Sequence, residues 1–325
     1  MPALAVSEQR AARQRAVTAR AVASADALWA RVDGRLIRAS WRQVAEQMLA
    51  VLIAAQQASA TGAQDYVAAA VAAAGARPDP VGELNVGAFA GLAADGRDLR
   101  SLLELPSIGA VTDVAAGLPS DLALQRGRSQ LLRTVTSEVT DAGRVASGVG
   151  IIADRRCTGY VRVVGGRGCA RCIILAGQVY GSAAAFDRHP NCQCIHEPTT
   201  RGRRSPIVQP REVFDGLSRA EQDRRFGKDG ARAIRDGAHL DQVVNARREG
   251  ALYTTADGRK ATREGASRRG YFYSRDRARA IRRGLVPASG RGFKVSARLM
   301  PEEIYRLAAT REEALQMLRR YAYLQ

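Results

Sequence analysis

The chain has 325 residues and a formal net charge of +18, with 46% hydrophobic and 25% charged residues. This composition allows a buried core in roughly two or three domains and excludes a wholly disordered protein. The sequence has no secretory signal pattern and no apolar run near the roughly 18 residues of a membrane span. We therefore expect no membrane partner and a reducing compartment.

Residues 1–117 are expected to form a helical docking region. Ser40 and Gln43 have the spacing of a capping box, which predicts a helix start. The apolar residues that follow at helical spacing are Trp41, Val44, Met48, Leu52 and Ala55. Between residues 80 and 119, repeated glycines and prolines predict only short helices separated by turns.

Residues 118–200 are expected to form a central core. A long amphipathic helix is predicted over residues 120–146, and the glycines in 148–150 are expected to end it. The β-branched character of residues 160–164 predicts a strand, and a second short strand is expected at 179–180.

Side chains that bind metals are concentrated at the end of this core. The candidate ligands are Cys169, Cys172, His189, Cys192 and Cys194. Glycines at 165, 166 and 168 predict a tight turn before the first cysteine, and two thiolates three positions apart can reach one ion only if the backbone turns sharply. We expect a structural zinc ion with four of these ligands, and His196 is a sixth candidate.

Three other interpretations of this window remain open. The cysteines can be buried thiols in a turn-rich core. A thioredoxin-like redox pair would need Cys169 at the start of a helix within a βαβ unit. A hydrolase would need a nucleophile such as Cys157 or Ser182 near His189 or His196. No nucleophile motif surrounds either residue, so we assign no catalytic residue.

Residues 201–325 are expected to form a basic α+β domain. They hold 29 Lys and Arg against 15 Asp and Glu, which is +14 of the net charge and indicates a polyanion partner such as nucleic acid. Five arginines follow the aromatic segment 271–273 and are the candidate nucleic-acid-binding residues: Arg275, Arg277, Arg279, Arg282 and Arg283. The alternative is a solvated helix face beside a small aromatic core.

Three further elements are predicted in this domain. Ser218 and Glu221 form a second capping box. Residues 254–270 are expected to be a loop or flexible hairpin, and residues 300–324 a single amphipathic helix opened by Pro301.

Five segments carry a resemblance to a known family. They are residues 133–138, the Cys169 to Cys172 turn, residues 173–180, the stretch from His189 to Cys194, and residues 214–224. The first four resemble the phage head-morphogenesis family typified by the F protein of phage Mu. The last is similar to the segment that follows this motif in minor capsid proteins of tailed phages infecting actinobacteria. The similarity covers about residues 120–250.

The resemblance implies a minor capsid protein in the phage head interior or near the portal, present in few copies and acting in head assembly. Its implied partners are the portal protein, the major capsid protein and packaged DNA. Because similar proteins are labelled capsid maturation proteases, such an enzyme is the first alternative, and a zinc-containing nucleic-acid-binding protein is the second.

The family's candidate metal residues carry over onto the five ligands named above, while residues 195–198 depart from its pattern and leave His196 as an extra candidate. The expected fold class is α+β, mainly helical. It comprises a helical N-terminal region, a small metal-knuckle α+β centre and a basic C-terminal α+β domain.

Overall fold

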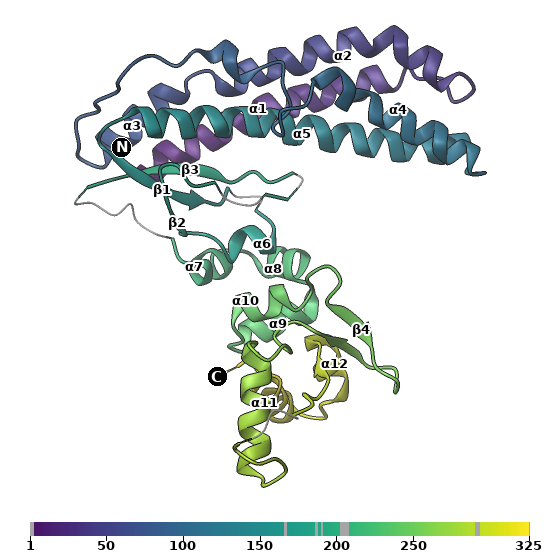
Figure 1. Cartoon of the computed structure of the whole chain (residues 1–325), viewed down its shortest axis with the longest axis vertical. Coiled ribbons are helices and arrows are strands. Elements are labelled where there is room, and N and C mark those ends of the chain that lie inside the picture. Colours follow the sequence, from purple (N-terminus) through teal and green to yellow (C-terminus); the bar gives the residue numbers. More distant parts are fainter. Residues whose placement is uncertain are drawn as a thin grey trace. The chain divides into compact units, whose positions relative to one another are not determined.

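The computed structural model describes residues 3–165, 168–185, 188–189, 191–201, 208–289 and 293–324. Its many helices and small antiparallel sheets confirm the α+β, mainly helical class (Figure 1). The chain forms two compact units, which we call the N-terminal and C-terminal units. The first comprises Met1–Gly168 and Ala176–Val208, and the second Cys169–Leu175 and Gln209–Gln325.

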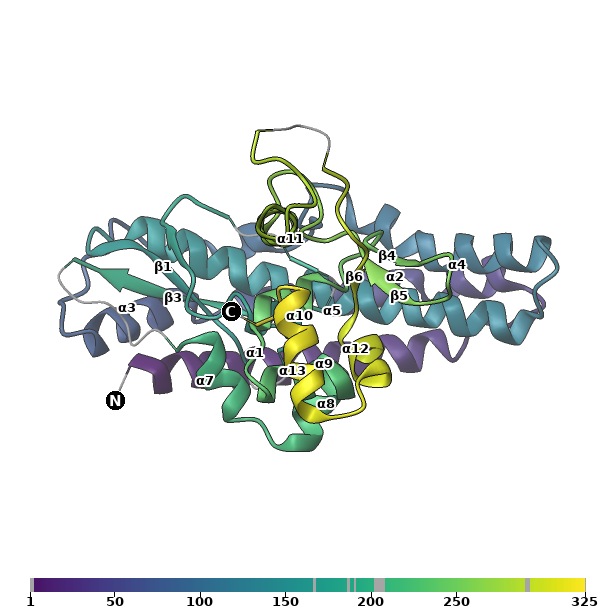
Figure 2. The same cartoon turned by 90° about the horizontal axis from the view of Figure 1, so that it is seen from below.

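Long helices make up most of the N-terminal unit. They are α1 (Ala3–Trp29), α2 (Ile37–Ala60), α3 (Ala63–Ala73), α4 (Leu99–Ala115) and α5 (Ser120–Ala153), with the 3-10 helix η1 (Val86–Phe89). Helices α1, α2, α4 and α5 run alongside one another as a bundle (Figure 2). The two tryptophans of the chain, Trp29 and Trp41, contact each other in its core, with ring centroids 5.6 Å apart.

The start of α2 differs from the prediction. All five apolar residues of the predicted series are buried, which confirms that face. The helix nevertheless begins at Ile37, and the Ser40 hydroxyl donates to the carbonyl of Leu36 within the first turn. The capping-box prediction for Ser40 was wrong because Ile37 is itself buried, so the apolar face starts earlier.

Two predicted helix breaks are also absent from the described residues. The prediction of only short helices before residue 119 was wrong, because α4 continues through the buried Pro106. The helix starts after Asp98, whose side chain accepts a hydrogen bond from Ser101 N. The glycines of 148–150 do not end α5. A Cβ on Gly150 would lie 3.2 Å from Val67, so the glycine serves close packing against α3 rather than termination.

An antiparallel sheet with the strand order β2-β1-β3 completes the N-terminal unit. Its strands are β1 (Cys157–Val163), β2 (Val179–Gly181) and β3 (Ile195–Thr200). The register pairs Tyr160 with Tyr180 and Arg162 with His196. The two predicted strands are confirmed, whereas β3 was not predicted, because its sequence is polar and contains Pro198.

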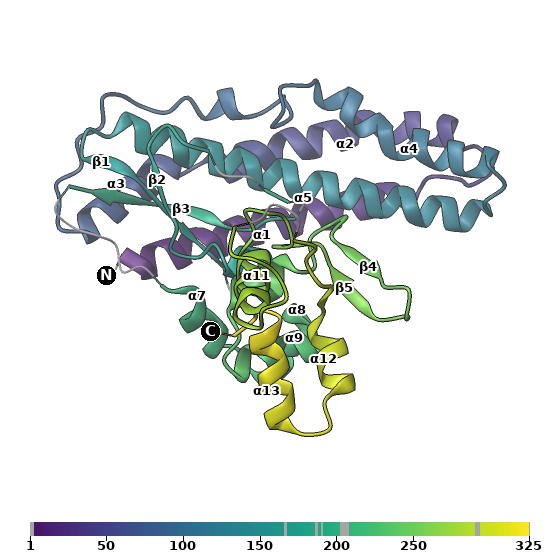
Figure 3. The same cartoon turned by 60° about the horizontal axis from the view of Figure 1, so that its bottom comes forward.

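The C-terminal unit consists of short elements (Figure 3). They are α6 (Ala170–Ile173), α7 (Pro210–Asp215), α8 (Arg219–Phe226), α9 (Lys228–Arg235), α10 (Leu240–Asn245), β4 (Leu252–Thr254), β5 (Lys260–Thr262), α11 (Tyr271–Arg282), β6 (Arg298–Leu299), α12 (Pro301–Leu307) and α13 (Arg311–Arg320). Arg298 is fully buried in its core and donates to the carbonyls of Tyr321 and Glu264 at 2.9 and 3.0 Å. One arginine thus satisfies backbone groups from separate loops.

Caps decide the helix boundaries of this unit. Ser218 caps α8 by accepting from Glu221 N, which confirms the predicted helix start, while the Glu221 carboxylate pairs with Arg224 and Arg225 rather than completing a capping box. The prediction of a single closing helix was wrong: Thr310 accepts from Glu313 N and starts α13 separately from α12. Residues 252–262 form the β4–β5 hairpin.

No helix among the described residues has both the length and the apolar character that a bilayer span requires.

Candidate metal centre

Cys169 and Cys172 are positioned by a turn followed by one turn of helix. Gly168 N donates to the carbonyl of Gly165 at 2.8 Å, while Gly166 of the predicted glycine turn lies outside the described residues. Cys169 then precedes α6, and Ile173 N donates to its carbonyl at 3.0 Å. This backbone brings the two sulfur atoms to 3.7 Å from each other.

His189 and Cys192 lie on a second turn. Cys192 N donates to the carbonyl of His189 at 3.1 Å, and Asn191 between them has a φ of 63°. Asparagine tolerates this left-handed conformation better than most residues, which explains how a non-glycine residue can close the turn. The buried residue Cys194 follows immediately before β3.

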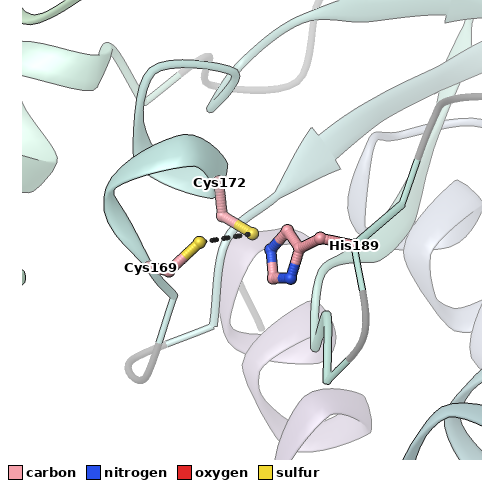
Figure 4. Close-up of side chains that lie close together, drawn as sticks. All are labelled: Cys169, Cys172 and His189. Atoms are coloured by element: carbon pink, nitrogen blue, oxygen red, sulfur yellow. Dashed lines mark hydrogen bonds between the residues drawn. The ribbon is translucent and has the colours of Figure 1, made fainter. Parts of the chain in front are cut away.

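The five predicted ligands fall into two groups that could hold a metal ion. One contains Cys169, Cys172 and His189, and the other Cys172, Cys192 and Cys194. Within each group, the potential ligand atoms all lie within 4.8 Å of one another. Figure 4 shows the imidazole of His189 beside the Cys172 sulfur, with Cys169 on the other side. Cys172 belongs to both groups and is only 1% exposed, so it is the central residue of the cluster.

The separation of the first two sulfur atoms suits a tetrahedral ion. A zinc–sulfur bond is about 2.3 Å, and two ligands at the tetrahedral angle are then about 3.8 Å apart. The distance between the sulfurs of Cys169 and Cys172 is 3.7 Å. The pair could therefore occupy two corners of a tetrahedron with little movement.

A buried arginine holds the loop that carries the other cysteines. Arg144 of α5 is 3% exposed and donates to the carbonyls of Cys192 and Cys194 at 2.6 and 2.9 Å. It also pairs with Asp141, which accepts from Arg188 at 2.7 Å. Burial raises the pKa of the Asp141 carboxyl, and the charges of Arg144 and Arg188 oppose that rise.

A second buried arginine approaches a sulfur directly. The Arg162 guanidinium on β1 lies 3.8 Å from the Cys192 sulfur, in hydrogen-bonding contact. A zinc ion bound by three or four thiolates keeps a net negative charge, which nearby arginines stabilise. The sequence reasoning missed both arginines. For Arg144, the small residues Thr140, Gly143 and Ser147 around it on the helix were the available signal of a buried face.

The residues considered for hydrolysis lie in other surroundings. The His196 ring stacks on Tyr160 at 4.0 Å, and burial, aided by nearby arginines, lowers its pKa to about 3. His196 is in neither metal-binding group of described residues. Burial and the charge of Asp154 raise the pKa of Cys157 to about 12, which disfavours the thiolate that a nucleophile needs. Ser182 is partly exposed, just after β2.

The redox interpretation meets one of its two conditions. Cys169 does stand at the start of a helix, although α6 has only four residues. The strand pairs formed by the described residues of this region are antiparallel, so they do not provide the βαβ unit of a thioredoxin-like site.

The five arginines predicted to bind nucleic acid are not equivalent. Arg275 donates to the Tyr271 hydroxyl at 2.9 Å, and Arg277 donates to the carbonyl of Ala288 at 2.7 Å, so both serve local structure. Arg279 and Arg282 lie further along α11, and Arg283 is its C-terminal cap.

In comparisons with known proteins, no family model matches this chain, and no curated protein or solved structure matches it either.

Proposed function

We propose that this protein is a non-enzymatic structural protein of a tailed-phage head, stabilised by one zinc ion bound in the cysteine and histidine cluster. The observation that carries the metal part is the cluster itself. Five potential ligands lie close together, with Cys172 shared between two groups and its sulfur at a tetrahedral spacing from that of Cys169.

Ligand chemistry favours zinc over other ions. Thiolates and imidazoles are the usual donors of structural zinc sites, whereas magnesium and calcium take oxygen ligands. Three of the four clustered cysteines are buried, which is typical of a closed structural site rather than a catalytic site with an open position. The ion's role would be to fix the two turns that carry its ligands.

The resemblance to the head-morphogenesis family supports the location in the head. Its segments include residues 133–138 on α5, both turns of the metal centre, and residues 214–224 on α7 and α8. The proposed partners are the portal protein, the major capsid protein and packaged DNA, with the protein in the head interior or near the portal.

Metal analysis of the full-length protein tests the zinc site. We expect about one zinc ion per chain after purification without chelator, and loss of the ion with a lower melting temperature in Cys172→Ser, because structural zinc contributes folding free energy. Cys157→Ser is the matched control, since Cys157 is outside both groups, and should keep the ion. A metal-free wild-type protein that melts like Cys172→Ser would contradict the proposal.

The head location and the absence of catalysis are tested in particles. Mass spectrometry of purified virions should find the protein at low copy number. Ser182→Ala, Cys157→Ser and His196→Gln variants should leave processing of the capsid proteins intact, provided that they fold. Loss of processing in a folded variant would favour the maturation protease instead.

A further inference from the structure

The C-terminal unit contains a shallow groove of about 410 Å³ between α11 and α13, which are labelled in Figure 3. The groove is lined by Arg279, Glu313, Gln316, Met317, Arg319 and Arg320. The two helices belong to one packed structure, because Phe272 of α11 lies 6.3 Å from Tyr321 at the end of α13, measured between ring centroids.

Positive charge gathers around this groove from both helices. Arg279 and Arg282 lie in the last turn of α11, and Arg283 is its C-cap. Arg319 and Arg320 lie in the last turn of α13. Burial lowers the pKa of Arg279, and the charges of Arg320 and Arg283 lower it further. Arg279 is therefore close enough to Arg320 and Arg283 to be repelled by their charges.

Acidic residues near the groove offset this charge only in part, since the charge of Asp276 opposes the lowering of the Arg279 pKa. Among the described residues, no ion pair joins an acid to any of the five arginines. Glu313 instead accepts from the backbone N–H of Ala309, and Asp276 accepts from Ser296.

Some other exposed arginines of the same unit are paired, whereas Arg219, Arg268 and Arg269 are exposed and join no ion pair among the described residues. Examples of the paired arginines are Arg211 with Asp215, Arg224 with Glu221, and Arg306 with Glu303. The groove thus differs from these paired positions in charge balance rather than in arginine content alone.

Helix dipoles explain only part of this arrangement. A cation at the C-terminal end of a helix is favourable, and both helices end in arginines. That effect would act equally if the helix ends were far apart. It does not account for arginines from two helices converging on one groove, where they repel one another.

We infer that the groove between α11 and α13 binds the sugar-phosphate backbone of DNA. Arg279, Arg319 and Arg320 would contact phosphates in the groove, and Arg282 and Arg283 would extend the contact beyond it. The guanidinium group matches phosphate oxygens in charge and geometry, and contacts to the backbone carry no sequence information. This inference rests on the DNA contact in the proposed function and deepens it, because it names the site.

A salt-dependent titration of the full-length protein with a short mixed-sequence duplex tests the groove. The groove variant carries Arg279→Gln, Arg319→Gln and Arg320→Gln. The matched control carries Arg211→Gln, Arg224→Gln and Arg306→Gln, which removes the same charge from paired positions. Melting temperatures establish that both variants fold.

If each groove arginine meets one phosphate, the slope of log affinity against log salt should fall in magnitude by up to about 2.7 units in the groove variant, and by much less in the control. Replacement of the same three arginines by lysine should restore most of the slope. Equal losses in the two glutamine variants, or no duplex binding by the wild type, would overturn the inference. Zinc content and presence in virions are measured separately, so failure of the groove and failure of the head role can be told apart.

Discussion

At the residue scale, Arg144 is the side chain on which the cysteine loop depends most. It donates to two carbonyls of that loop and pairs with Asp141, while being almost completely buried. Residues that orient metal ligands commonly affect metal affinity by about 10- to 100-fold. Arg144 therefore links the long helix α5 to the geometry of Cys192 and Cys194.

We predict that Arg144→Met weakens zinc binding by about 10- to 100-fold and destabilises the protein by roughly 3–5 kcal/mol. The buried carbonyls of Cys192 and Cys194 lose their donor, and Asp141 keeps only Arg188 as an ion-pair partner. Competition with a chromophoric chelator measures the first effect and urea unfolding the second. Arg155→Met is the control, since Arg155 pairs with Asp79 at an exposed position. Wild-type zinc affinity in Arg144→Met would show that the loop is held by other contacts.

At the scale of elements, α5 is fitted to its neighbours by glycines. A Cβ on Gly143 would lie 2.4 Å from the Ser59 hydroxyl and 2.8 Å from the Ser59 carbonyl of α2. Gly148, five residues later, has more room, because its Cβ would be 3.6 Å from His196. Helix propensity alone would favour alanine at both positions.

We predict opposite signs for these two substitutions. Gly143→Ala should cost about 1–3 kcal/mol through overpacking against backbone, whereas Gly148→Ala should be neutral or stabilise by up to about 1 kcal/mol. Urea unfolding of both variants checks this. A stabilised Gly143→Ala would mean that α5 can shift away from α2 without loss.

At the scale of the whole molecule, two features differ in their residues: a candidate metal centre of cysteines and a histidine, and a C-terminal segment with most of the net charge. The C-terminal 125 residues hold +14 of the +18. Some of the positive charge there is paired locally, whereas the arginines that line the groove join no ion pair in the described part of the chain.

We predict that zinc affinity falls steeply on acidification. Thiolate and imidazole ligands must be deprotonated to bind, so protons compete with the ion as pH decreases, and each titrating ligand adds up to about one unit of log affinity per pH unit. Equilibrium dialysis between about pH 8 and pH 6 measures the slope. Cys157→Ser should follow the wild type, whereas an affinity independent of pH would exclude thiolate ligation.

Local patterns in the amino-acid order were enough to predict several elements and the metal-ligand candidates. Strand β1 and the Ser218 cap depend on neighbouring residues, so their signals are visible in the sequence. The spacing of the cysteines likewise limits which residues can meet at one ion.

Contacts between distant residues decided the rest. Helix α4 passes through Pro106 and α5 through its glycines because packing with other helices outweighs the local tendency of these residues to break a helix. Arg144 meets the cysteine loop across about 50 residues of chain, and Arg320 meets Arg279 from another helix. Such contacts depend on how the chain folds back on itself, so the spacing of neighbouring residues does not predict them.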